Sequence, residues 1–272
     1  MTTIASPQNP RLQQLRRLHR RRERARSGSF LAEGEDLIAA AAAAGWKPLE
    51  GYRAVGSGLG DGFLDVEPAA LAAVSTLGSG TRAIGVYKER WSATLAGPLW
   101  VYLHGLSDPG NVGAILRAAY AFGASGVALG PGCADPYSPK AVRASMGAIF
   151  TVPLARVHEV SELPGELIAL VAHAGEPLRS LHVSAPLTLL VGAEREGLPE
   201  EVLAVCGRVA HIPIAGDSLN AAMAATIALY EMSNPIGRGA QPKPADTRLR
   251  RESPLQPTGV PPAAPPSKVL PA

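Results

Sequence analysis

Isolated polar side chains interrupt apolar stretches of this 272-residue chain, and their types suit the handling of an oxygen nucleophile. Arg117 lies in LHGLSDPGNVGAILRAAYAFGA (103–124), where apolar residues recur at helical spacing and leave Arg117 away from the buried face. A guanidinium keeps its proton, because its pKa lies above about 12. A guanidinium in a site can therefore orient an oxygen or a phosphate and stabilise developing negative charge. A role as a general base would need an unusually desolvated guanidinium.

Two further polar candidates lie beside turns. Asn111 follows SDPG, where capping of the helix that begins there is an equally good interpretation. Glu194 lies in GAEREG (192–197), directly after the apolar run LTLLV. Ligands bind at the carboxyl ends of parallel strands, and Gly192 has no Cβ to obstruct them. The pattern therefore predicts a ligand against the backbone of Gly192, with Glu194 nearby.

A third segment, HIPIAGDSLNAAMAATIALYE (211–231), predicts a strand, a loop and a helix over residues 219–232. We expect Asp217 or Ser218 to cap this helix. Asn220 lies in its first turn, where packing gives no reason for an amide. An apolar stripe at helical spacing is predicted to face the core; it consists of Leu219, Met223, Ile227 and Tyr230.

The elements that must position these residues form an α/β pattern in three parts. Residues 1–92 alternate helical and strand signals and predict a small α/β domain. Residues 98–234 contain recurring short apolar runs separated mostly by helical segments, which predicts a parallel sheet covered on both faces. Residues 235–272 hold ten of the 25 prolines and almost no apolar periodicity, so we expect a disordered tail.

Composition adds few constraints on function. The net charge is only +3, but eight arginines and one acid, Glu23, lie between Arg11 and Arg26. This basic run could neutralise phosphates or be a solvated helix face. Cys133 and Cys206 lack the spacing of a metal or redox pair, and no histidine has a ligand partner. The N-terminus carries no signal peptide and no apolar stretch could span a bilayer, so we expect a cytoplasmic protein that uses neither membrane nor metal.

Taken in order, the three segments resemble motifs 1, 2 and 3 of the SpoU/TrmH-type RNA 2′-O-ribose methyltransferases, members of the SPOUT superfamily. The resemblance implies a trefoil-knot methyltransferase domain, S-adenosylmethionine as cofactor and a homodimer in which both chains complete a site. It implies main-chain contacts to the cofactor from Gly192, Ile212 and Leu219. The residues that it implies for catalysis are Asn111, Arg117, Glu194, Ser218 and Asn220.

Two other regions also resemble this family. DPYSPKAVRASMGAIFTVPL (135–154) contains its Arg-x-Ser-x-Gly pattern, so Arg143 is expected to hold an RNA phosphate, whereas a surface ion pair is the better interpretation of Lys140. SPQNPRLQQLRRL and RSGSFLAEGEDLIAAA resemble the ribosomal-protein-like extension that binds ribosomal RNA in such enzymes. The basic run then becomes an expected RNA contact; its candidate residues are Arg16, Arg17, Arg20 and Arg21.

The resemblance leaves alternatives open. The same chemistry could serve transfer RNA, or protect ribosomal RNA against an antibiotic. A catalytically silent RNA-binding or ribosome-assembly protein could use the same scaffold, although every candidate site residue is in place. A Rossmann dinucleotide enzyme is the least favoured, because no G-x-G-x-x-G joins a strand to a helix at the start of an α/β unit.

Overall fold

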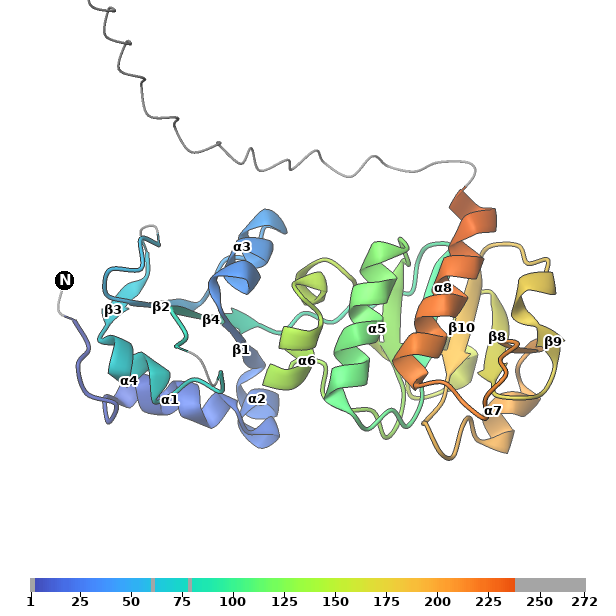
Figure 1. Cartoon of the computed structure of the whole chain (residues 1–272), viewed down its shortest axis with the longest axis horizontal. Helices are drawn as coiled ribbons and strands as arrows, with labels where there is room; N and C mark the ends of the chain where they lie inside the picture. The colour runs from blue at the N-terminus through green and yellow to red at the C-terminus, as the bar shows by residue number, and fades with distance from the viewer. Residues whose placement is uncertain (1–2, 60–61, 78–79, 238–272) are drawn as a thin grey trace, which may run out of the picture. The chain divides into compact units, whose positions relative to one another are not determined.

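The computed structural model describes residues 3–59, 62–77 and 80–237 (Figure 1). Its N-terminal part holds a four-stranded sheet in the order β1-β4-β2-β3. β4 (Ala83–Lys88) pairs antiparallel with β1 (Ser29–Glu33) and β2 (Glu50–Ala54), and β3 (Leu64–Val66) runs parallel to β2. The helices of this part are α1 (Pro10–Leu18), α2 (Arg21–Ser27), α3 (Glu35–Ala43) and α4 (Pro68–Ala72).

The N-terminal helices begin and end where their residues predict. Pro10 occupies the first turn of α1 and Asn9 caps it by accepting a hydrogen bond from the amide of Arg11. Leu12, Leu15 and Leu18 are buried, so α1 packs its apolar face against the sheet. α3 ends before Gly45, whose φ of +72° is the left-handed conformation that ends helices. The basic run spans two helices, α1 and α2, with a break at His19 and Arg20.

The second part contains a seven-stranded parallel sheet in the order β7-β6-β5-β10-β8-β11-β9. Its strands are β5 (Leu99–Leu103), β6 (Gly126–Leu129), β7 (Leu154–Arg156), β8 (Glu166–Val171), β9 (Glu176–Pro177), β10 (Leu187–Val191) and β11 (Arg208–His211). Its helices are α5 (Pro109–Ala121), α6 (Pro139–Ala144), α7 (Glu200–Ala204) and α8 (Ala221–Gly237), with 3₁₀ turns at Ala148–Phe150, Val160–Glu162 and Leu178–Ser180. The predicted parallel α/β fold is confirmed.

Both faces of the large sheet are covered, as the apolar strand runs predict. β5 shows the alternation: Val101 and Leu103 face the cluster that contains α5 and α8, whereas Trp100 and Tyr102 face the cluster that contains α7. α5 and α8 lie side by side on one face (Figure 1). No helix among the described residues is long and apolar enough to cross a membrane.

Three local expectations are wrong. The apolar run IFTVPL (149–154), one of those predicted to form the sheet, is not a continuous strand: Ala148–Phe150 is a 3₁₀ turn and β7 starts at Leu154, because Gly147 turns the chain with a φ of +92°. The side chains of Met223, Ile227 and Tyr230 are 59%, 38% and 53% exposed rather than buried. The buried face of α8 consists instead of four alanines with Leu229 and Met232, and α8 contacts α5. α8 also continues to Gly237, and the rest of the proline-rich segment lies outside the described residues.

One face of the N-terminal sheet shares an aromatic cluster with the second part, whereas its other face has a core of its own. Phe30 lies 4.6 Å from Tyr137, and Trp46 lies 5.3 Å from Phe150, measured between ring centroids. The indole of Trp46 also donates a hydrogen bond of 2.7 Å to the carbonyl of Phe150. Phe30 and Trp46 belong to the N-terminal part, so this cluster joins it to the loops around the large sheet.

Candidate active site

The N-terminus of α5 carries Asn111 inside the helix rather than at its cap. The cap is Asp108, whose carboxylate accepts a 2.8 Å hydrogen bond from the amide of Gly110, and Pro109 follows at the first helical position. Lys140 donates to the same carboxylate at 2.6 Å, and this contact, with that of Gly110, lowers the pKa of Asp108. Lys140 thus forms the predicted surface ion pair. Because Asp108 caps the helix, the side-chain amide of Asn111 does not.

Asn111 instead joins the three segments singled out in the sequence. Its Nδ2 donates to the carboxylate of Glu194, and its Oδ1 accepts a 3.1 Å hydrogen bond from Nδ2 of Asn220. These residues come from α5, from the loop after β10 and from the start of α8. Three of the five predicted catalytic residues therefore form one hydrogen-bonded chain, and each amide has a fixed orientation.

Asn220 has a structural role that the sequence did not reveal. Its Oδ1 accepts hydrogen bonds from the amides of Ala222 and Met223, at 3.0 Å and 3.3 Å, so Asn220 caps α8. The expectation that Asp217 or Ser218 caps this helix is wrong, because α8 begins only at Ala221. One side chain thus both caps the helix and holds Asn111.

The loop that carries Glu194 is a tight turn closed by its own backbone. Ala193 and Gly197 exchange hydrogen bonds of 3.2 Å and 3.0 Å between their amides and carbonyls. A Cβ added to Gly192 would lie 2.2 Å from the carbonyl carbon of Gly197. Gly192 is therefore required by this close approach within the loop, not only by space for a ligand as expected.

A cavity of about 230 Å³ lies at the carboxyl ends of β8, β10 and β11. Its apolar wall includes Leu170 and Val171. Most of the predicted site residues also line it, and these are Gly192, Glu194, Ile212, Ser218 and Leu219. The strand ends of an open parallel sheet are where ligands bind, and apolar side chains with exposed backbone suit a flat heterocycle. The lining therefore fits a nucleoside-type cofactor such as S-adenosylmethionine.

Arg117 lies apart from this cluster within one chain. It is exposed on α5, it does not line the cavity, and its side chain forms no hydrogen bond or ion pair with another described residue. Six residues separate it from Asn111, which corresponds to about 9 Å along a helix axis. It lies one turn before Tyr120, whose side chain is 58% exposed. The chain alone therefore does not bring Arg117 to the other four predicted catalytic residues.

The predicted RNA contacts differ in their surroundings. Arg17, Arg20 and Arg21 are exposed, and Arg16 donates a 3.1 Å hydrogen bond to the carbonyl of Ala73. The guanidinium of Arg143 is exposed and donates to Thr76 Oγ1 at 3.1 Å. These side chains come from the N-terminal helices and from α6.

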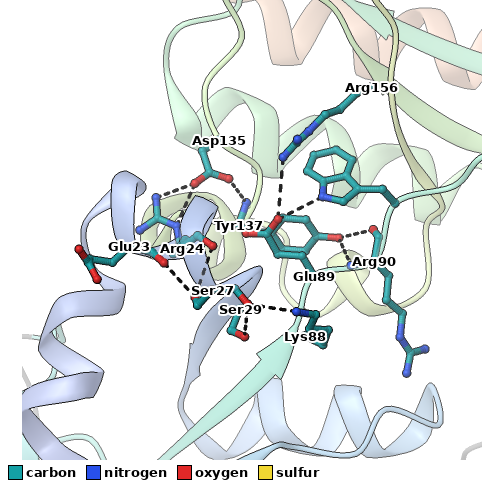
Figure 2. Close-up of polar contacts among 11 residues, drawn as sticks. Glu23, Arg24, Ser27, Ser29, Lys88, Glu89, Arg90, Asp135, Tyr137 and Arg156 are labelled. Carbon is teal, nitrogen blue, oxygen red and sulfur yellow. Dashed lines mark hydrogen bonds and ion pairs between the residues drawn. The ribbon is translucent and has the colours of Figure 1, made fainter.

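One arginine of the basic run is structural, which the sequence could not reveal. The Arg24 side chain is 3% exposed, and its guanidinium binds the carboxylate of Asp135 at 2.6 Å and 2.9 Å (Figure 2). Its Nη1 also donates to the carbonyls of Leu18 and His19, at 2.8 Å and 2.9 Å. Arg24 therefore holds the end of α1 and the loop after β6 together.

Comparison with known proteins agrees with this geometry. Residues 98–230 match the model of the SpoU rRNA Methylase family, and residues 9–63 match that of the MRM3-like substrate binding domain. An uncharacterized tRNA/rRNA methyltransferase of Synechocystis sp. is 31% identical over 85% of this chain and 93% of its own length. The 23S rRNA (guanosine(2553)-2′-O)-methyltransferase RlmP of Bacillus subtilis is 28% identical over 85% of this chain and 99% of its own. The AdoMet-bound rRNA methyltransferase of Sinorhizobium meliloti superposes with a TM-score of 0.78 at 31% identity, covering 86% of this chain and 98% of that one.

Proposed function

Because this chain belongs to the SpoU rRNA methylase family, we propose that it transfers a methyl group from S-adenosylmethionine to a ribose 2′-hydroxyl of ribosomal RNA. The observation that carries the proposal is the hydrogen-bonded chain of Glu194, Asn111 and Asn220 beside the cavity. Relatives named as 23S rRNA 2′-O-methyltransferases and an AdoMet-bound neighbour support the substrate class and the cofactor.

The cavity residues divide into those for the cofactor and those for the hydroxyl. Main-chain atoms of Gly192, Ile212 and Leu219 would hold the cofactor, which supplies an already activated methyl electrophile when bound. Glu194 lines the cavity and Asn111 is hydrogen-bonded to it, so the two side chains can accept from and donate to an incoming ribose. Ser218, exposed in the loop before α8, adds a hydroxyl to the same lining. Orienting the hydroxyl toward the electrophile supplies much of the rate.

Arg117 would act across a dimer interface. Tyr120, Met223, Ile227 and Tyr230 expose large apolar surfaces on α5 and α8, which favours burial against a second copy. Arg117 lies on α5 one turn from Tyr120, so in a homodimer it would reach the partner's site and stabilise charge on the attacking oxygen. β5 and β8 precede β10 in the chain and lie on either side of it in the sheet, and α8 then contacts both β10 and α5. This chain path supports the trefoil knot of the family.

Methyl transfer can be tested with tritiated S-adenosylmethionine and unmodified ribosomal RNA or transfer RNA, offered separately, followed by nucleoside analysis. We expect label in a 2′-O-methylnucleoside of ribosomal RNA. Label only in transfer RNA would keep the reaction and change the substrate. Label on a base would contradict the ribose assignment. Cofactor binding by calorimetry without transfer to either RNA would favour a silent RNA-binding protein on this scaffold.

A further inference from the structure

A second cavity, of about 360 Å³, lies where α2 meets the carboxyl ends of β6 and β7. None of the predicted catalytic or cofactor residues lines it. Its charged and aromatic lining consists of Arg21, Glu89, Trp91, Asp135, Arg156 and His158. The Asp135 carboxylate is already paired with Arg24, and Glu89 is 3.9 Å from Arg156, so Arg21 is the cation of this wall that no carboxylate approaches among the described residues.

Arg156 and Trp91 form a stack whose orientation is fixed from behind. The guanidinium carbon of Arg156 lies 4.0 Å from the centroid of the Trp91 ring. Glu89, whose side chain is 9% exposed, accepts a 3.1 Å hydrogen bond from the Trp91 indole and pairs with Arg156 (Figure 2). Burial raises the pKa of the Glu89 carboxyl. The Trp91 ring also packs edge-on against Tyr137 at 5.3 Å.

The stack leaves one face of a guanidinium open toward solvent. The Arg156 side chain is 60% exposed although its inner face covers Trp91. Unpaired RNA bases stack on aromatic rings and on guanidinium planes, and cations beside such a platform hold the adjoining phosphate. Arg21 from α2 supplies such a cation on the same wall.

This cavity adjoins the candidate active site along one edge of the sheet. A Cβ on Gly132, in the cavity wall, would lie 3.1 Å from the Cα of Gly105, and a Cβ on Gly105 would lie 3.4 Å from Ala193. Ala193 belongs to the loop that carries Glu194. β6 is two strands from β10, a separation of about 10 Å. A single-stranded RNA can therefore reach both cavities.

We propose that this cavity binds one unpaired nucleotide of the substrate RNA near the methylated ribose, with its base stacked on Arg156 and its phosphate beside Arg21. The inference rests on the proposed function, since it assigns the cavity to the RNA of the same reaction. Stacking of one base changes affinity by about tenfold or more.

The test uses the full chain and fluorescein-labelled short oligoadenylate, with affinity measured by anisotropy. We expect Arg156→Gln and Arg156→Lys each to weaken binding about tenfold, because lysine keeps the charge but has no flat face. The matched control is Arg90→Gln, since Arg90 is also exposed and stacks on a tryptophan, Trp46, at 3.8 Å, but lies outside the cavity lining. Unchanged melting temperatures would confirm that each variant folds.

A 4-thiouridine cross-link locates the bound RNA directly. We expect cross-linked peptides from residues 89–91, 130–136 or 156–158. Wild-type affinity in Arg156→Lys, an equal loss in Arg90→Gln, or cross-links confined to other segments would overturn the proposal. Methyl transfer to ribosomal RNA, measured on the same proteins, separates the two claims. If methyl transfer occurs but the Arg156 variants bind RNA like the wild type, the proposed function stands and the cavity has no role in it. If the Arg156 variants bind RNA more weakly but no methyl transfer occurs, the cavity binds RNA and the proposed function is wrong.

Discussion

The side-chain amide of Asn220 makes two kinds of hydrogen bond, one through its oxygen and one through its nitrogen. Its oxygen caps α8 by accepting from the amides of Ala222 and Met223, and its nitrogen donates to Asn111. The two ends of an amide cannot exchange roles, so capping of the helix fixes which end faces Asn111. Stability of α8 and orientation of the site are therefore coupled through one side chain.

Two substitutions at Asn220 separate these roles. Asn220→Asp keeps an acceptor for the cap but cannot donate to Asn111, so we expect wild-type stability and at least about tenfold lower methyl transfer. Asn220→Ala should lose the same activity and about 1 kcal/mol of stability as well. Thermal melts and initial rates measure the two effects. Equal destabilisation by both variants would contradict the capping role.

Arg117→Ala tests the charge that lies outside the cluster. Loss of a positioned donor to a developing oxyanion lowers kcat about 100- to 1000-fold. We expect the melting temperature and the cofactor affinity to stay unchanged, because Arg117 is exposed and does not line the cavity. Arg179→Ala, at an exposed arginine on a 3₁₀ turn, is the control. A fall in cofactor affinity as large as the fall in rate would assign Arg117 to the cofactor instead.

The site could be predicted only as far as local patterns reach. Motif order identified Asn111, Glu194 and Asn220, and the structure brings these three together. Capping of α5 by Asn111, one of its two interpretations, is wrong, since Pro109 marks Asp108 as the residue before the first turn. The contact between Asn220 and Asn111 spans 109 residues, so no local pattern could have revealed it.

At the scale of elements, the joint between α2 and the loop after β6 depends on a buried ion pair. Arg24→Ala would leave the Asp135 carboxylate, which is 14% exposed, without its guanidinium. We expect a loss of about 3 kcal/mol in the free energy of unfolding, since removing one partner strands a buried charge. Arg26→Ala is the matched control on the same helix, because the 72% exposed Arg26 forms a surface ion pair with Glu23, and its loss should cost under about 1 kcal/mol. Urea titration of both variants compares them, and equal losses would deny Arg24 this role.

Glu89 gives the same region a pH dependence. Burial raises its pKa in the folded chain above the ordinary value of 4.5. The folded state then binds the proton more tightly, so this group contributes a stability that falls as pH rises from 4.5 through the raised pKa. In Glu89→Gln this component disappears while an acceptor for the Trp91 indole remains. Melting temperatures between acidic and neutral pH measure the difference, and parallel pH profiles would refute the assignment.

Prediction of the elements was most successful for the apolar strands of the large sheet. β5, β6, β8 and β10 are short apolar runs, and all four lie in the parallel sheet. β2, EGYRA, carries the exposed Glu50 and the half-buried Arg53 and has no apolar run to reveal it. The exposed stripe of α8 was misassigned because helical spacing identifies an apolar face without identifying its partner. The actual core face consists largely of four alanines, with Leu229 and Met232, and a hydrophobicity pattern ranks alanine low.

For the whole molecule, that stripe leads to a prediction about assembly. We expect Ile227→Asp to convert a homodimer to monomers, because a carboxylate would be buried against the partner. Sedimentation equilibrium would measure the association, with Ala39→Asp, at an exposed position of α3, as the control. If Arg117 acts across the interface, the monomer should also lose methyl transfer while its cofactor affinity persists. A wild type that sediments as a monomer would contradict the prediction.

The aromatic cluster shared by the N-terminal part and the second part constrains how substrates are chosen. Phe30 and Trp46 pack against Tyr137 and Phe150. The helices α1 and α2, which carry the exposed arginines, belong to the same N-terminal part as Phe30 and Trp46. Those arginines therefore cannot swing freely toward the loop of Glu194. The protein would therefore select RNA by distance. It would accept an RNA whose folded shape presents a phosphate surface and a ribose at one fixed separation. Changing the RNA target of such an enzyme would require an N-terminal part that packs differently against the large-sheet part, and a longer connection between the two parts would not be enough.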